Sequence, residues 1–155
     1  MMQWTTFLAA AVGAIAGALG TGIADRFRWH RDVSERERQA LQDSYAEFLD
    51  SVKRTGSAIS QVAHDSAQSS EVRAKQARMA MDQHGLYEKQ AHVEICAPES
   101  IFPLLKDLVR DLLSLRDDVS RGSGPSDPSY EEVWLSIHRD SVKLREAMRT
   151  TLARK

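Results

Sequence analysis

The chain is poor in the residues that interrupt helices. Its 155 residues include a single cysteine, Cys96, so no disulfide can form within the chain. No proline precedes Pro98, and only Gly56 and Gly85 lie between residues 23 and 121. Because proline and glycine are the least favourable residues inside a helix, this scarcity favours long helices over most of the sequence.

The chain also lacks an excess of charge of either sign. It has 21 basic and 22 acidic residues and a formal net charge of −1. Binding to duplex nucleic acid rests on a basic face, so we expect no nucleic acid partner. Apolar residues at 42% and charged residues at 28% are typical of a folded chain and exclude global disorder.

One long segment has no charge at all. Residues 4–24 form an uninterrupted run of 21 uncharged residues. At 1.5 Å per residue, a helix of this length crosses the roughly 30 Å hydrocarbon core of a bilayer. The run therefore predicts a single-pass transmembrane anchor over residues 1–25, with the lipid bilayer as its partner.

The residues around this segment predict its orientation. Arg26, Arg28 and Arg31 follow it closely, whereas no charged side chain precedes it. Positive residues favour the cytoplasmic side, so we expect the C-terminal domain in the cytoplasm at the cell membrane. Trp4 and Trp29 stand at the two ends, where aromatic rings favour the membrane interface.

Two other interpretations compete with the anchor. A secretory signal peptide would begin with a basic region, which this sequence does not have. A buried helix of a soluble protein stays open as an alternative, because the segment contains seven alanines and four glycines and is only moderately apolar.

Small residues share one face of the predicted anchor. They are Ala9, Gly13, Gly17 and Thr21, and the two glycines form a G-x-x-x-G motif. This spacing lets two helix backbones approach closely in lipid, so it predicts a homo-oligomer that packs through this face. The alternative is that so much alanine and glycine produces the motif by composition alone.

Beyond the anchor, apolar residues recur at helical spacing in four segments. A mostly polar stretch at residues 26–40 predicts a helical stalk that continues the anchor, and residues 41–155 predict a helical domain. The expected helices cover about residues 26–67, 70–96, 101–119 and 129–152, with Gly85 as a weak point of the second. Pro98 is expected to stand at the start of the third helix. Ser70 is expected to cap the N-terminus of the second helix. Ser129 and Glu132 are expected to form a capping box at the start of the last helix. The predicted core stripes are Leu41, Tyr45, Phe48, Val52, Ile59 and Val62; Met79, Leu86 and Val93; Ile101, Leu105, Leu108, Leu112, Leu115 and Val119; and Tyr130, Trp134, Ile137, Leu144, Met148 and Leu152.

These patterns predict an all-α protein. The expected fold is an N-terminal transmembrane helix that continues into a long helix, followed by an antiparallel four-helix bundle-like soluble domain. The third apolar segment is the most regular, and we expect it to form the centre of the core.

Short motifs resemble those of a known group of proteins. The Arg/Glu-rich residues 35–38, the stretch Tyr45–Leu49 and the junction at residues 93–101 are similar to segments of small, mostly uncharacterised actinobacterial membrane-anchored proteins. The resemblance implies a membrane-anchored helical bundle. It implies no catalytic residue and no cofactor.

Candidate chemistry is sparse. His84, Glu88, His92 and Cys96 recur every four residues, but successive steps rotate around a helix and the four side chains cannot meet one metal ion. A second cluster, Glu131, Glu132, His138 and Asp140, is interpreted as a solvated helix face. We therefore expect no catalytic site, no cofactor and no metal.

The sequence favours a membrane-anchored interaction or scaffold protein. The expected partners are the lipid bilayer, a second copy of the chain and an unidentified cytoplasmic protein. A small membrane-active protein, such as a pore-former or a lysis or defence effector, is the alternative.

Overall fold

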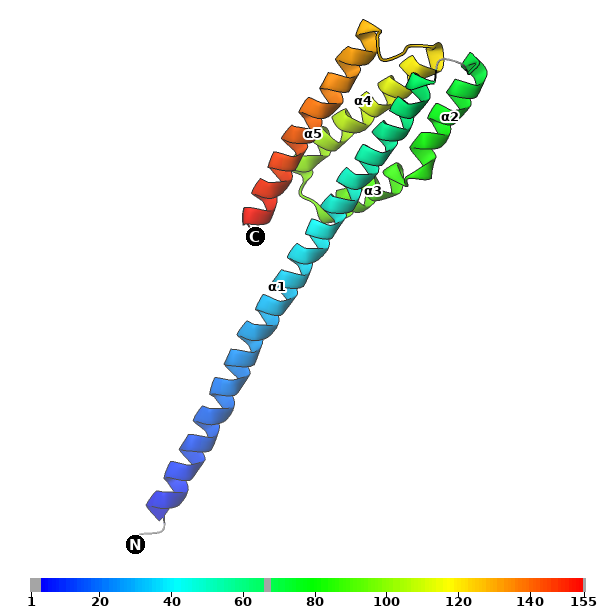
Figure 1. Cartoon of the computed structure of the whole chain (residues 1–155). Coiled ribbons are helices and arrows are strands. Elements are labelled where there is room, and N and C mark those ends of the chain that lie inside the picture. The colour runs from blue at the N-terminus through cyan, green and yellow to red at the C-terminus, as the bar shows by residue number, and fades with distance from the viewer. Residues whose placement is uncertain (1–3, 66–67, 155) are drawn as a thin grey trace. The chain divides into compact units, whose positions relative to one another are not determined.

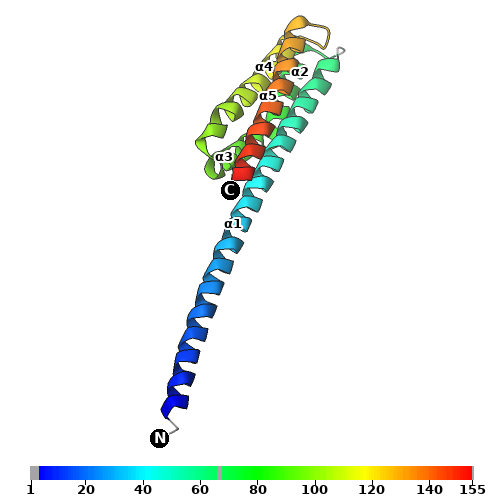
Figure 2. The same cartoon turned by 90° about the vertical axis from the view of Figure 1, so that its left-hand side faces the viewer.

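The structure is a computed structural model that describes residues 4–65 and 68–154, with side-chain environments for residues 33–65 and 68–153 (Figures 1 and 2). All regular structure in these residues is helical, and no strand occurs among them. The elements are α1 (Trp4–His64), α2 (Ser70–Gln83), α3 (Leu86–Cys96), the 3₁₀ turn η1 (Glu99–Ile101), α4 (Phe102–Arg121) and α5 (Pro128–Arg154).

The chain divides into two compact units, Met1–Gln39 and Ala40–Lys155. In the part of the chain whose side chains are described, no helix is long and apolar enough to cross a membrane. The predicted anchor segment lies outside the residues with described side chains. A transmembrane helix therefore stays a prediction at this point.

The second unit confirms the predicted all-α bundle. Figures 1 and 2 show its helices running in alternating directions, with α1, α2, α4 and α5 packed along one another. Polar contacts tie neighbouring helices together at the surface. Lys89 of α3 donates to Glu47 of α1 at 3.0 Å, and Ser136 of α5 donates to Asp111 of α4 at 2.7 Å.

Helix α4 lies at the centre of the core, as its sequence predicted. Its apolar stripe begins in η1 and is almost completely removed from solvent along its whole length. The six buried residues of this stripe are Ile101, Leu105, Leu108, Leu112, Leu115 and Val119. Burying each large aliphatic side chain contributes about 1.5–3 kcal/mol.

The stripe on α1 is also confirmed, with polar additions that the pattern did not predict. Its members from Leu41 to Ile59 are buried, and Val62 packs at the edge of the core. Ser44 and Ser51 are buried beside them and donate hydrogen bonds back to the carbonyl oxygens of their own helix. Small hydroxyl residues satisfied in this way let neighbouring helices approach α1 closely.

The predicted second helix is two helices. Gly85 adopts φ +61°, and this left-handed residue ends the run at Gln83 and restarts it at Leu86. The prediction that Met79 lies in the core is wrong, because this side chain is 56% exposed, whereas the nearby Met81 is buried. The break rotates the apolar face, so Leu86 and Val93 still reach the core.

Two predicted helix starts shift by one residue. Ser69 rather than Ser70 caps α2, and its hydroxyl accepts a hydrogen bond from the Val72 amide at 3.4 Å. Helix α5 begins at Pro128, so Ser129 lies inside the first turn and the predicted capping box is wrong. Proline suits that position because its missing N–H needs no partner there.

The C-terminus of α4 is closed by a glycine. Gly122 has φ +105°, and its amide bonds to the Val119 carbonyl while the Ser123 amide bonds to that of Asp118. This pair of bonds forms a Schellman motif, which satisfies the last carbonyls of the helix. Arg73 of α2 donates to the Gly122 carbonyl at 3.5 Å and joins this end to the neighbouring helix.

Truncation of a central α4 side chain tests the core. We expect Leu108→Ala to lower the free energy of unfolding by about 2–5 kcal/mol, because it leaves a cavity in a fully buried position. Ile95→Ala, which removes the same kind of side chain from a position that is 81% exposed, should change it by less than about 0.5 kcal/mol. Urea unfolding of the full chain measures both, and equal losses would contradict the assigned core.

The left-handed glycine between α2 and α3 gives a second prediction. Gly85→Ala should destabilise the protein by about 1–2 kcal/mol, because an L side chain is strained at positive φ. A Cβ atom at Gly85 would meet no atom closer than 3.6 Å, so the loss reports the backbone conformation and not a steric clash. Gly124→Ala, at a loop glycine without positive φ, is the control and should be nearly neutral. If both variants unfold at the same urea concentration, the break at Gly85 is not the left-handed one described.

Candidate functional site

The sequence-predicted site residues in the anchor lie outside the residues with described side chains. They are the packing face of Ala9, Gly13, Gly17 and Thr21, and the interface residues Trp4, Arg26, Arg28, Trp29 and Arg31. Their roles stay predictions.

The residues of the four-step histidine and cysteine pattern do not form a cluster. His84 ends α2, and Gly85 separates it from Glu88, His92 and Cys96 on α3. Glu88, His92 and Cys96 are all exposed, so Cys96 is not a core residue. Within the described residues, no three His, Cys, Asp or Glu side chains are placed to hold a metal ion.

The acidic cluster on α5 is a solvated surface. Glu131, Glu132 and His138 are exposed. Asp140 pairs with Lys143 at 2.8 Å and with Arg139 at 3.7 Å. The hydrogen bond from Lys143 holds the pKa of the Asp140 carboxyl below its ordinary value, although partial burial opposes this shift. A carboxylate kept ionised in this way is a poor proton donor at neutral pH.

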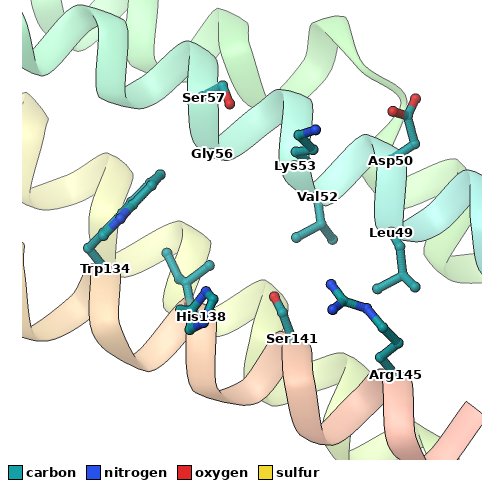
Figure 3. A pocket seen from close by; sticks show the side chains of 11 residues that line it. Leu49, Asp50, Val52, Lys53, Gly56, Ser57, Trp134, His138, Ser141 and Arg145 are labelled. Atoms are coloured by element: carbon teal, nitrogen blue, oxygen red, sulfur yellow. The ribbon is translucent and has the colours of Figure 1, made fainter.

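A groove between α1 and α5 combines an apolar floor with charged side chains (Figure 3). It encloses about 480 Å³, within the range of small-molecule sites in proteins. Its floor is apolar and consists of Leu49 and Val52 from α1 and Trp134 and Ile137 from α5. Figure 3 shows Leu49 and Val52 pointing toward α5, and Trp134 pointing toward α1.

Gly56 determines how closely the two helices approach at one end. A Cβ atom placed there would lie 3.6 Å from Leu112 and 3.7 Å from the indole ring of Trp134. The Trp134 ring stacks on Tyr130, with ring centroids 6.2 Å apart and an interplanar angle of 7°. The Tyr130 hydroxyl in turn donates to Ser60 of α1 at 2.9 Å. The indole therefore leaves room at position 56 for a methyl group but not for a longer side chain, and 37% of Trp134 stays exposed.

Arg145 lines the opposite end of the groove together with Ser141, whose hydroxyl lies on the same side of α5 (Figure 3). Lys53 of α1 lines the groove between the two ends, about one helical turn from Gly56. Asp50 also lines the groove, but Arg54 neutralises it through an ion pair at 2.7 Å. Neither the Lys53 nor the Arg145 side chain forms an ion pair or hydrogen bond within the described part of the chain. The groove thus has Trp134 at one end and the unpaired Arg145 at the other, about 16 Å apart along α5 at 1.5 Å per residue, and the unpaired Lys53 lies between them.

The sequence patterns did not predict this groove. The apolar stripe of the last helix placed Trp134 in the core, and no pattern gave Gly56 a role. One feature of the sequence pointed to the groove, namely a glycine in the middle of a long amphipathic helix. A glycine there lowers helix stability by about 1 kcal/mol relative to alanine, so its presence often marks close packing against another element. That signal does not identify the facing helix, which only the three-dimensional packing provides.

A second groove, between α1 and α2, has a different character. It encloses about 360 Å³ and is lined by amide side chains, among them Gln61, Gln76 and Gln83. It contains no basic side chain. This lining gives no chemical basis for selecting a ligand.

The size of residue 56 tests the geometry of the α1–α5 groove. Gly56→Ala should raise the free energy of unfolding by up to about 1 kcal/mol, because the new methyl group finds ordinary contact distances in a helix interior. Gly56→Leu should lower it by about 1–3 kcal/mol, because the longer side chain displaces the Trp134 ring. Urea unfolding measures both changes in the free energy of unfolding. If Gly56→Ala lowered this free energy as much as Gly56→Leu does, the distances of 3.6–3.7 Å from residue 56 to Leu112 and Trp134 would be contradicted.

Comparison of the chain with protein-family models, with curated proteins and with solved structures finds no match. The resemblance to actinobacterial membrane-anchored proteins therefore stays a prediction, and function is argued from the residues of this chain alone.

Proposed function

We propose that the protein is a single-pass membrane-anchored interaction or scaffold protein. The observation that carries this proposal is the run of 21 uncharged residues at positions 4–24, followed by three arginines within seven residues. A helix of this length matches the hydrocarbon core, and the arginines favour a cytoplasmic location for everything that follows.

Self-association through the anchor is part of the proposal. Gly13 and Gly17 lie four residues apart and share a helix face with Ala9 and Thr21. In lipid, where apolar burial does not drive helices together, close backbone packing over such small residues does.

The helical domain supplies the surface for a cytoplasmic protein partner. Leu135 and Val142 are exposed and lie seven residues apart on α5, so they share one face of that helix. The proposal assigns no catalytic step. Ser57, His138 and Ser141 line the α1–α5 groove, but among the described residues no hydrogen bond joins His138 to either serine, as an activated nucleophile would require.

Fractionation and a topology reporter test the anchor. A reporter fused after Lys155 should be active only in the cytoplasm, and the fusion should stay with membranes after a carbonate wash. A fusion that is washed off, or a reporter signal on the outer side, would overturn the anchor or its orientation.

Paired substitutions test the packing face separately. Gly13→Ile with Gly17→Ile should shift the chain toward monomer in detergent, because the larger side chains separate the backbones. Ala11→Ile with Ala18→Ile places the same change roughly 130° around the helix from the two glycines and is the matched control. Cross-linking yields that fall equally in both pairs, or in neither, would remove self-association from the proposal.

A membrane-active protein is the other function that an anchor rich in glycine and alanine accommodates. The two functions differ in their effect on membrane potential. Induced expression should leave the signal of a potential-sensitive dye unchanged for an interaction protein, whereas depolarisation would favour the membrane-active alternative.

A further inference from the structure

We propose that the α1–α5 groove binds a single-chain anionic amphiphile of the fatty-acid class. The carboxylate would lie at the end formed by Arg145 and Ser141, within the positive field to which Lys53 adds from the facing helix, and the acyl chain would extend toward Trp134. This site lies wholly within the unit of residues 40–155 and does not depend on the proposed anchor.

The distribution of charge favours a ligand with one anionic end. Lys53 and Arg145 come from facing helices and have no acidic partner within the described residues. The nearby Asp50 is already paired with Arg54, so it does not cancel their charge. An arginine with free N–H groups presents a fork that matches a carboxylate, and Ser141 adds a hydroxyl donor beside it.

The rest of the groove favours an apolar chain. Val52 and Ile137 are buried members of the core that also line the groove floor. The indole of Trp134 is held in place by Tyr130 behind it, yet it keeps an exposed face toward the groove. A rigid aromatic surface of this kind gives an apolar ligand contact area at little cost in side-chain entropy.

The size of the groove decides between a small amphiphile and a protein helix. A partner helix about 10 Å across that fills roughly 16 Å of groove would cover on the order of 160 Å² in projection. Stable protein interfaces bury about 800 Å² on each partner. The cavity of about 480 Å³ is instead within the range of small-molecule sites.

Fluorine NMR of the full chain tests the proposal at the site itself. Replacing the three tryptophans with 5-fluorotryptophan gives one signal each for Trp4, Trp29 and Trp134. The chain is placed in phosphatidylcholine nanodiscs, or in buffer if fractionation leaves it out of membranes. Titration with dodecanoate should shift the Trp134 signal saturably, while Trp4 and Trp29 report unspecific partitioning of the fatty acid.

Charge reversal separates the head-group contact from apolar binding. Lys53→Glu with Arg145→Glu should weaken dodecanoate binding by roughly tenfold or more, because two charge-assisted contacts are lost. Arg149→Glu makes the same change at an exposed position one turn further along α5 and should leave binding unchanged. Dodecanol, the neutral analogue, should bind the wild-type chain more weakly than dodecanoate does, and the double variant should lose this preference.

Several outcomes would overturn the proposal. They are an unsaturable Trp134 shift, equal binding of dodecanol and dodecanoate, and an equal loss in the Arg149→Glu control. An acidic amphipathic peptide that shifts Trp134 at a lower concentration than dodecanoate would assign the groove to a protein partner instead. None of these outcomes bears on the membrane anchor, which fractionation tests independently.

Discussion

Burial of the apolar face of α4 is the interaction on which the rest of the helical domain depends. Its stripe from Ile101 to Val119 is almost fully enclosed, and no single neighbouring helix can cover a helix that is buried along its whole length. Helices α1, α2 and α5 must therefore surround it. Their own apolar faces are narrower and leave their outer sides polar.

This dependence explains which parts of the fold the sequence predicted. Where the apolar period is strong, in α1, α4 and most of α5, the predicted core residues are buried. In α2 the period is weak, and alanines rather than large side chains make the contacts. Ala77 and Ala80 are buried while Met79 points away. Alanine is common on both faces of helices, so periodicity alone did not identify the buried face.

The sequence showed a glycine at position 85 inside the predicted second helix, but it did not show that this glycine divides the segment into two helices. A glycine inside a helical pattern is tolerated in some helices and ends others, and local propensity does not decide between the two. The structure resolves the choice because Leu86 and Val93 both have to reach the core after α2 has already contributed Met81. A left-handed residue reorients the chain within two positions, which a continuous helix cannot do.

The groove could not be predicted in the same way, because it belongs to a pair of helices that are distant in sequence. Gly56 and Trp134 are 78 positions apart, and each is meaningful only when the other is known to face it. The same is true of Lys53 and Arg145, which look like ordinary surface cations until both are found to line one apolar groove. Their charges are unneutralised there, although the domain pairs many of its other exposed charges locally.

The groove and the core are not separable parts of this domain. Val52 and Ile137 contribute to both, so the side chains that hold α1 and α5 against α4 also form the surface that a ligand would contact. A ligand that binds only the folded state stabilises it by RT ln(1 + [L]/Kd), which is about 2.7 kcal/mol at a ligand concentration of 100 Kd. That contribution is comparable to burying one large aliphatic side chain. Occupancy of the groove would therefore act on the packing between α1 and α5 directly, because a bound ligand adds contacts to both helices.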